Sequence, residues 1–449
     1  MTQRYDTYKD SGVQWLGEIP GHWEVLRIKN ICECYGRIGF RGYTTNDFVP
    51  EGCGAITISP SNMKDIKMDF SRCSYLSWNK YYESPEIQIK EGDVLFVKTG
   101  STYGKTSYVD YLPTASTINP QIVCFKNHKQ SPKFLAFLFN TKVGKMQVEF
   151  SLVGGTIPTI AQSKIVNYSF AFPPLSEQHS IVSYLDAKCG KIDEWVTQKQ
   201  KEMEHLQELK QRVIADAVTR GLNPHVKMKA TNIPWLKEIP GHWDCIRLTT
   251  CILSSVVGSW GVDEKKDGTD ILCLRVADFD YNKGIIKEDK LTYRNYEGKL
   301  SEEKFFRDGD LLLEKSGGGD IYPVGRVVRF SLNGRIATCS NFIQKLTPNS
   351  EIVSSDYLYF WFKMIYSLKI NGMYFNQTTG IQNLKVNEYL KQKIYLPPLS
   401  EQKQIVSYLD AKTSKIDKLI ANITKEIECI KEYKQRLISD VVTGQIKVC

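Results

Sequence analysis

The stretch PPLSEQHSIVSYLDAK at residues 173–188 returns almost unchanged as PPLSEQKQIVSYLDAK at residues 397–412. Two further blocks are also written twice: WLGEIPGHWEVLRI at 15–28 returns as WLKEIPGHWDCIRL at 235–248, and KQRVIADAVT at 210–219 returns as KQRLISDVVT at 434–443. The copies lie 220 to 224 residues apart, a spacing much longer than the repeat of a solenoid. The chain is therefore a tandem of two half-proteins of the same plan.

The blocks that follow each Pro-Pro-Leu predict a long helix. In the first copy Ser176 is a good N-cap, and Glu177 places a carboxylate in the first turn, where the helix dipole favours it. A 3.5-residue apolar repeat then runs to Thr219, and nine of its eleven seam positions are apolar in each copy. Both copies carry a lysine at the ninth position, Lys210 and Lys434. A repeat held this long predicts a coiled coil, whose seam includes Leu185, Ile192, Val196 and Leu206 in the first helix and Leu409, Ile416, Ile420 and Ile430 in the second.

The simplest partner for each long helix is the other helix of the same chain. At about 1.5 Å per residue, each helix would be roughly 65 Å long. An antiparallel pair would carry one globular module at each end. The alternative is that each helix pairs with a separate subunit.

The domain organisation follows from these helices and from the glycine and prolines after the first one. We predict an α+β protein with two mixed α/β domains separated by two long helices that form an antiparallel coiled coil, related as a pseudo-two-fold tandem repeat. Runs such as AITISP, DVLFVKT, QIVCFK and DILCLRV predict strands; KFLAFLFNTKV and DYLYFWFKMI predict short helices. The predicted segments are 1–172 (first domain with an N-terminal arm), 173–221 (first helix), 222–234 (linker), 235–396 (second domain) and 397–449 (second helix).

Composition sets limits on the class of protein. The net charge of +9 comes from 59 basic and 50 acidic residues, which permits nucleic-acid binding without demonstrating it. The twelve cysteines form no C-x-x-C pair, so reduced, mostly buried thiols are expected rather than a zinc site. The polar start MTQRYDTYKDSG has no signal-peptide core, and no apolar run is long enough to span a membrane. We therefore expect a cytoplasmic protein.

One loop resembles a phosphate-binding loop. The stretch KTGSTYGKT at residues 98–106 follows an apolar run, but only three residues separate its glycines, where the nucleotide-binding pattern needs four. Pro113 and β-favouring residues follow instead of a helix, so no helix N-terminus is available for the anion. The second half has Gly325-Arg326-Val327 at this point, without the lysine or the hydroxyl. ATP hydrolysis by this loop is not expected.

Other catalytic patterns fail as well. The nearest approach to a methyltransferase motif is INPQ at 118–121, which lacks the second proline and the aromatic residue, and the acidic residues do not form a nuclease cluster. His22 and His242 stand at the same place in the two PGHW blocks, which favours a structural role. No nucleophile–base pair and no metal site are expected.

The segments that differ between the halves contain cations, hydroxyls and aromatic residues, which can contact phosphates and base edges. YGRIGFRGYTTND and KTGSTYGKT carry such residues in the first half, and the counterpart KSGGGDIYPVGRV and its neighbours carry them in the second. Lys98 and Lys315 occupy the same place in the two halves. The candidate DNA contacts are Arg37, Arg41, Tyr43, Lys98, Ser101, Tyr103, Lys105, Arg275, Lys315, Ser316 and Arg326, with Lys265 and Lys266 as further cations.

The repeated PPLSEQ…IVSYLDAK blocks, the EIPGHW starts and the two divergent segments resemble the specificity subunit of type I restriction–modification systems. The resemblance covers almost the whole chain. It implies two target-recognition domains, residues 15–172 and 235–396, that each read one half of a bipartite target in double-stranded DNA. It also implies that the helices at 176–219 and 400–443 form a spacer between the half-sites.

The resemblance further implies a chain without catalysis of its own, acting in phage defence in a bacterium or archaeon. It would bind two methyltransferase subunits and, through them, restriction or translocase subunits. S-adenosylmethionine, ATP and Mg²⁺ are expected in those partner subunits, where the chemistry would be adenine N6 methylation and ATP-dependent cleavage. The alternatives are a stand-alone fused DNA methyltransferase or restriction enzyme, and a pure protein–protein adaptor.

Overall fold

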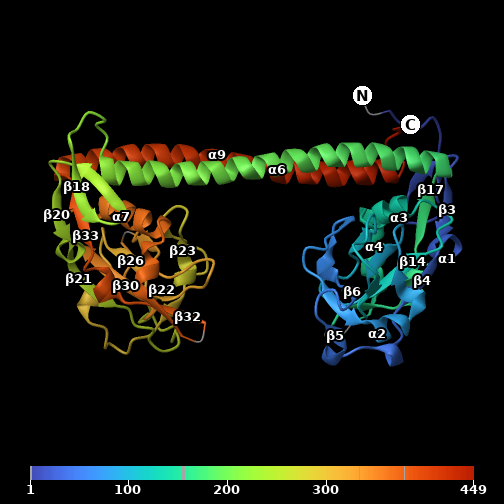
Figure 1. The fold of residues 1–449 in the computed structure, drawn as a ribbon, viewed down its shortest axis with the longest axis horizontal. Helices are drawn as coiled ribbons and strands as arrows, with labels where there is room; N and C mark the ends of the chain where they lie inside the picture. The colour runs from blue at the N-terminus through green and yellow to red at the C-terminus, as the bar shows by residue number, and fades with distance from the viewer. Residues whose placement is uncertain (1–2, 154–156, 333, 379, 449) are drawn as a thin grey trace. The chain divides into compact units, whose positions relative to one another are not determined.

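The chain divides into two compact units, which we describe separately. The structure, a computed structural model, describes residues 3–153, 157–332, 334–378 and 380–448. Unit 1 comprises Met1–Lys199 and Thr424–Cys449, and unit 2 comprises Gln200–Ile423. The division falls within the two long helices, α6 (Leu175–Arg220) and α9 (Leu399–Val442). Each unit thus holds one module and a segment of both helices (Figure 1).

The predicted linker at 222–234 lies within unit 2. Part of the linker forms β18 (Met228–Ile233), which pairs with β19 (Leu236–Pro240) inside unit 2. In unit 1 the N-terminal arm makes the corresponding pair, β1 (Tyr8–Asp10) with β2 (Glu18–Pro20). The arm also contacts the end of the chain, because the Tyr8 hydroxyl donates to the Gly444 carbonyl over 2.8 Å.

The module of unit 1 is built from two larger sheets, smaller two-stranded sheets and short helices. Strand order in the larger sheets is β10-β13-β6-β9-β5 and β12-β11-β14-β4. Their bounds are β4 (Glu33–Gly36), β5 (Phe48–Val49), β6 (Gly54–Ile58), β9 (Ser74–Ser77), β10 (Gln88–Ile89), β11 (Val94–Val97), β12 (Thr106–Tyr108), β13 (Ser116–Ile118) and β14 (Ile122–Lys126). The helices are α1 (Ile28–Ile31), α2 (Trp78–Tyr82), α3 (Pro132–Phe139), α4 (Lys142–Ser151) and α5 (Gln162–Ile165), and β3 (Glu24–Arg27) pairs with β17 (Ser169–Phe172).

The module of unit 2 repeats this plan with different lengths. Its four-stranded sheet has the order β28-β26-β30-β21, which matches β12-β11-β14-β4 strand for strand. The bounds are β21 (Ile252–Val257), β22 (Ile271–Leu274), β25 (Tyr293–Arg294), β26 (Leu311–Glu314), β27 (Ser316–Gly317), β28 (Val327–Arg329), β29 (Ala337–Cys339), β30 (Ile343–Pro348), β31 (Phe375–Thr378) and β32 (Ile381–Leu384). The helices are α7 (Ser355–Ser367) and α8 (Val386–Tyr389), and β20 (Asp244–Arg247) pairs with β33 (Lys393–Leu396).

The predicted strands and the helix at 356–365 are confirmed, and one predicted helix is interrupted. The run KFLAFLFNTKV forms two helices, because α3 ends at Phe139 and α4 begins at Lys142. The Thr141 hydroxyl accepts a hydrogen bond from the Gly144 backbone over 3.2 Å and so acts as the N-cap of α4. A further correction concerns α6, which begins at Leu175, so Ser176 lies inside the helix and is not its N-cap.

The long helices pair antiparallel within each unit, as predicted for two helices of the same chain. In unit 1 Leu185 and Ile192 are buried, and in unit 2 Leu409 and Ile416 are buried. The other predicted seam residues, Val196, Leu206, Ile420 and Ile430, are half-buried. The helices also pack on their modules, since the seam joins the same buried clusters as the sheet and helix residues of each unit.

The two seam lysines find equivalent partners. In unit 2 the Lys210 ammonium lies 2.6 Å from Asp417 on the other helix, and in unit 1 Lys434 lies 2.5 Å from Asp193. A polar pair in an apolar seam fixes the register of two helices, because any shift would leave the charge without its partner. The lysine at the ninth position of each copy is thus explained.

The repeated PGHW blocks bind the first turn of each helix. In unit 1 His22 Nε2 lies 2.8 Å from Glu177 Oε2, and the Trp23 indole donates to Glu177 Oε1 over 3.3 Å. In unit 2 His242 and Trp243 make the same contacts with Glu401, at 2.7 and 3.2 Å. Both tryptophans are fully buried. This arrangement agrees with the structural role predicted for the two histidines.

Candidate nucleic-acid interface

The loop that resembles a phosphate-binding loop is the turn of a β-hairpin. It connects β11 to β12, which pair antiparallel with Phe96 opposite Thr106. No helix follows it within the described residues up to Lys126, since the next elements are strands β12, β13 and β14. The backbone therefore offers no helix N-terminus to an anion, as the sequence predicted.

The second unit builds the same hairpin from different residues. Val97 N–H donates to the Lys105 carbonyl over 2.9 Å, and Glu314 N–H donates to the Arg326 carbonyl over 2.8 Å. The return bonds also match: Gly104 donates to Val97 over 2.8 Å, and Gly325 donates to Glu314 over 2.9 Å. Val97 and Glu314, and likewise Lys105 and Arg326, therefore occupy equivalent places.

The predicted equivalence of Lys98 and Lys315 is confirmed by the backbone. Lys98 N–H donates to the Gln121 carbonyl over 2.8 Å, and Lys315 N–H donates to the Phe342 carbonyl over 2.9 Å. Both side chains are half-buried. A Cβ on Gly36 would lie 3.6 Å from the Lys98 ammonium, so this lysine lies beside the start of the 37–43 segment.

The predicted contacts in the 37–43 segment divide by exposure. Arg37 is only 6% exposed, donates to the Ile118 carbonyl and to Thr117 Oγ1, and lies over the ring of Tyr43. Burial lowers the pKa of Arg37 below its ordinary value. Burial therefore argues against direct DNA contact by Arg37, whose observed bonds hold the segment to the sheet. Arg41 is more accessible and lies 3.5 Å from Glu86.

Three other predicted contacts of unit 1 lie in the hairpin turn. Ser101 is exposed, and Tyr103 is half-buried against the core of the unit. Lys105 donates to the Pro60 carbonyl over 3.1 Å. Tyr43 lies instead in the 37–43 segment, and its hydroxyl lies 3.3 Å from Thr57 Oγ1 of β6.

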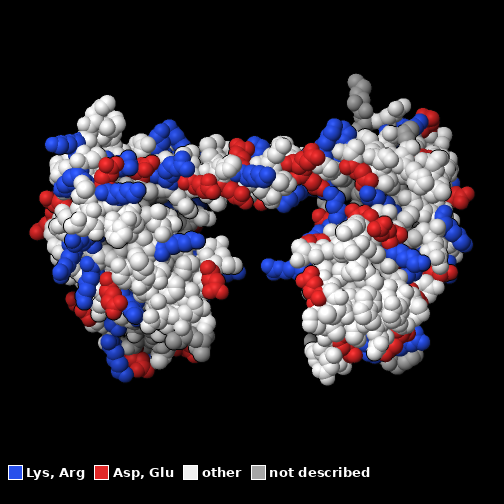
Figure 2. Space-filling model, in the orientation of Figure 1, with Lys and Arg blue, Asp and Glu red and all other residues white. Residues whose placement is uncertain are grey.

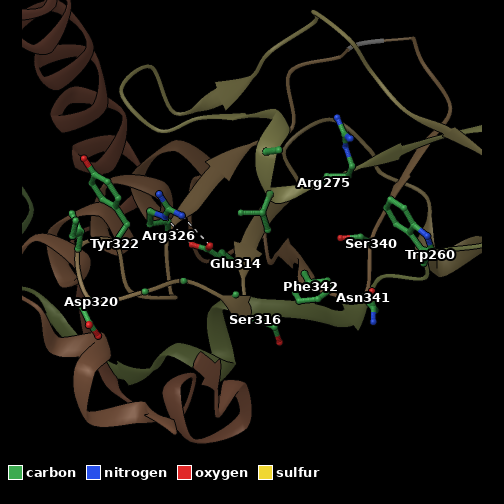
Figure 3. Close-up of a pocket in the computed structure, with 16 residues that line it drawn as sticks. Trp260, Arg275, Glu314, Ser316, Asp320, Tyr322, Arg326, Ser340, Asn341 and Phe342 are labelled. Carbon is green, nitrogen blue, oxygen red and sulfur yellow. Dashed lines mark hydrogen bonds and ion pairs between the residues drawn. The ribbon is translucent and has the colours of Figure 1, made fainter. Parts of the chain in front are cut away.

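In unit 2 three predicted contacts gather around one pocket of about 940 Å³ (Figure 3). Arg275, Ser316 and Arg326 all line it, although they lie on separate segments of the chain. Arg275 is held by Asp278 at 2.7 Å, and this hydrogen bond raises the pKa of Arg275. The Ser316 hydroxyl donates to Asn383 over 2.7 Å.

Sequence reasoning missed several residues of this pocket. Figure 3 shows Glu314 in its wall, joined to Arg326 by dashed lines. Aromatic side chains also line the pocket and remain partly exposed: Trp260 by 39%, Phe342 by 42% and Tyr322 by 63%. Tyr322 lies in the divergent turn KSGGGDIYPVGRV, so its position there was a usable signal. Glu314 gave none, because its role depends on a partner twelve residues further along the chain.

Burial dominates the electrostatics of the Glu314–Arg326 pair. The Glu314 side chain is fully buried, and burial raises its pKa above the ordinary value. Burial also acts to lower the pKa of Arg326, but the hydrogen bonds to Glu314 outweigh that effect and raise it. The guanidinium therefore stays charged at the wall of the pocket.

The described surface carries charges of both signs and no metal cluster or membrane-spanning helix among the described residues. On the face drawn in Figure 2, Lys and Arg are interleaved with Asp and Glu, including along the long helices. Among residues 3–153, 157–332, 334–378 and 380–448 there is no group of three His, Cys, Asp or Glu side chains that could hold a metal ion. Within the same ranges no helix is long and apolar enough to cross a membrane.

Known proteins that resemble this chain belong to one family. The family model of the type I restriction modification DNA specificity domain matches residues 20–205 and 262–429. The chain is 22% identical to the type I restriction enzyme StySPI specificity subunit of Salmonella potsdam, over 96% of this chain and 90% of that protein. It is also 22% identical to the MjaVIII specificity subunit of Methanocaldococcus jannaschii, over 81% of each.

A solved structure has the same fold. A chain from a structure of a type I R-M system superposes with a TM-score of 0.68 at 18% identity, covering 94% of this chain and 98% of the other. The match spans both modules and both long helices.

Proposed function

Because the chain belongs to the family of type I restriction–modification DNA specificity proteins, we propose that each of its modules reads one half of a bipartite target in double-stranded DNA. The chain is a specificity subunit with two recognition domains. Such subunits bind DNA and assemble with the other subunits of the system. That the target consists of two half-sites, one for each module, is the proposal made here.

One observation carries this proposal. The two units build the same hairpin with the same backbone hydrogen bonds, yet they place Val97 and Lys105 in one and Glu314 and Arg326 in the other. Side chains rather than the backbone discriminate base edges. A shared backbone frame with different side chains therefore supports two modules that recognise two different DNA sequences in a similar way.

The proposed assembly contains two methyltransferase subunits and, through them, restriction or translocase subunits. The PGHW and PPLSEQ blocks recur in both units, which supports two copies of one partner. The specificity subunit has no catalysis of its own. Adenine N6 methylation with S-adenosylmethionine, and cleavage driven by ATP with Mg²⁺, would belong to the partners.

We also propose that the long helices fix the gap between the half-sites. α6 and α9 each begin in one unit and end in the other. The lysine–aspartate pairs at Lys210 and Lys434 support a fixed register. A fixed register would keep the gap constant from one target to the next.

A module exchange tests the proposal. The full chain is reconstituted with its cognate methyltransferase subunits, and methylated adenines are mapped by sequencing a DNA library. Replacing residues 15–172 with those of another specificity subunit should change one half-site and leave the other and the gap unchanged. A change in both half-sites would contradict modular reading. Methyl transfer by the purified chain alone would instead support a fused enzyme, and absence of any sequence preference would support an adaptor.

A further inference from the structure

The equivalent places in the two hairpins hold pairs of different chemistry. In unit 1 Val97 is apolar and Lys105 reaches the Pro60 carbonyl. In unit 2 Glu314 and Arg326 form an ion pair instead. Unit 1 folds the same hairpin without such a pair, so the hairpin itself does not require one. Because a buried ion pair contributes little to stability after desolvation, its presence in a pocket wall indicates a function.

The geometry of the pair leaves one edge of the guanidinium for a ligand. Arg326 Nε donates to Glu314 Oε2 over 2.8 Å, and Nη2 donates to Oε1 over 3.0 Å. The carboxylate thus occupies the side edge. Among the described residues no acceptor is bonded to Nη1, so the end edge, formed by Nη1 and the second hydrogen of Nη2, stays available. Arg326 lines the pocket and its side chain remains 17% exposed.

The plane of the guanidinium is also fixed. Its central carbon lies 3.7 Å from the ring centroid of Tyr281 and 5.6 Å from that of Tyr322. With Glu314 along one edge and Tyr281 against one face, Arg326 has little freedom to rotate. An arginine held in this way presents two parallel donors, which match the O6 and N7 acceptors of guanine in the major groove.

We infer that Arg326 reads a guanine in the half-site of unit 2 and that Glu314 is the positioning residue that aims it. This inference rests on the proposed function, because it requires that unit 2 reads DNA. Unit 1, with Val97 and Lys105, has no fixed two-donor fork at this place and reads its half-site by other contacts.

The test compares target preferences of the full chain, assembled with its methyltransferase subunits, on a randomised duplex library. Wild type should select a guanine at one position of the second half-site. Arg326→Ala should reduce that preference by about 5- to 150-fold, the range for one bidentate base contact. All other positions should stay unchanged. Glu314→Gln should weaken the preference at the same position, which a merely structural role would not do.

Two further variants distinguish loss of the base contact from loss of the folded structure. The double variant Glu314→Val with Arg326→Lys places the residues of unit 1 in the hairpin of unit 2. The equivalent hairpin of unit 1 folds with these residues, so the double variant should fold and should lose most of the guanine preference. Arg329→Ala is the matched control, because Arg329 also pairs with an acid, Asp356 at 2.8 Å, and lies over a tyrosine, but it does not line the pocket. It should leave the preferred sequence intact.

The outcomes separate the two proposals. A bipartite target that keeps its guanine preference in folded Arg326→Ala overturns the inference and leaves the proposed function standing. A second half-site without guanine also overturns it. Absence of any sequence preference in the wild-type complex overturns both.

Discussion

The contacts of Glu177 and Glu401 give an internal comparison within one chain. Substituting Glu177 by alanine would remove the acceptor of the buried Trp23 indole and of the Tyr5 hydroxyl, which lies 2.6 Å away. Glu401→Ala would remove the acceptor of the Trp243 indole, and no tyrosine among the described residues donates to Glu401. The two substitutions differ mainly by this one hydrogen bond.

The expected costs follow from these contacts. A buried indole N–H left without an acceptor costs about 1–3 kcal/mol, and a hydrogen bond to a charged group contributes about 1.5–3 kcal/mol. Loss of a carboxylate from the first helical turn adds about 0.3–1 kcal/mol. We expect Glu177→Ala to destabilise unit 1 by about 3–7 kcal/mol, and Glu401→Ala to destabilise unit 2 by about 1.5–3 kcal/mol less, which is the contribution of the Tyr5 hydrogen bond. Glu177→Gln keeps an oxygen for both donors and should cost less than half as much.

The assay is urea unfolding followed by tryptophan fluorescence, with each variant compared with wild type. Trp23 and Trp243 lie at the perturbed contacts and are fully buried, so they report directly on the two units. A Glu401→Ala variant as destabilised as Glu177→Ala would refute the role given to Tyr5. A cost below about 0.5 kcal/mol for Glu177→Ala would refute the reasoning as a whole.

Three further predictions follow from the helices and their packing. Asp417→Asn should destabilise unit 2 by about 1–2 kcal/mol, because it leaves the ammonium of Lys210 in the seam without its charge partner. Lys210→Met should change the stability of unit 2 very little. Equal losses of stability for the two variants in urea unfolding would contradict this prediction. Burial lowers the pKa of Lys363 from 10.5 to about 8, so the folded state binds this proton less tightly than the unfolded state. The free energy of unfolding of wild type relative to Lys363→Met should therefore rise between pH 8 and 10.5, by at most about 1.4 kcal/mol per pH unit, and stay level below pH 8; a flat difference across this range would count against it. Inserting one heptad at 196–206 and another at 421–431 should lengthen the gap between the half-sites by about 3 base pairs, because seven helical residues add about 10 Å. An unchanged gap in the methylation map would contradict the spacer role.

The tandem architecture could be predicted from the amino-acid sequence alone. Heptad spacing is a local property of the chain. The helices, their apolar seam and the two lysines within that seam, Lys210 and Lys434, could therefore be predicted from one sequence. The spacing of Gly100 and Gly104 similarly excluded a nucleotide-binding loop, because the required turn depends on residues adjacent in the chain. The break between α3 and α4 could not be predicted from the apolar pattern, because one capping side chain, Thr141, decides where α4 begins.

Which of the predicted residues are accessible to a ligand depends on the three-dimensional fold. Arg37 and Arg326 look alike in sequence, yet one is buried against Thr117 and the other lines a pocket. Glu314 meets Arg326 because antiparallel pairing of β26 with β28 places residues on either side of the turn together. Such a pairing depends on strand register and turn length, which act across the chain rather than along it. The apolar repeat therefore predicts the frame, while the register of the hairpin decides what the frame presents to DNA.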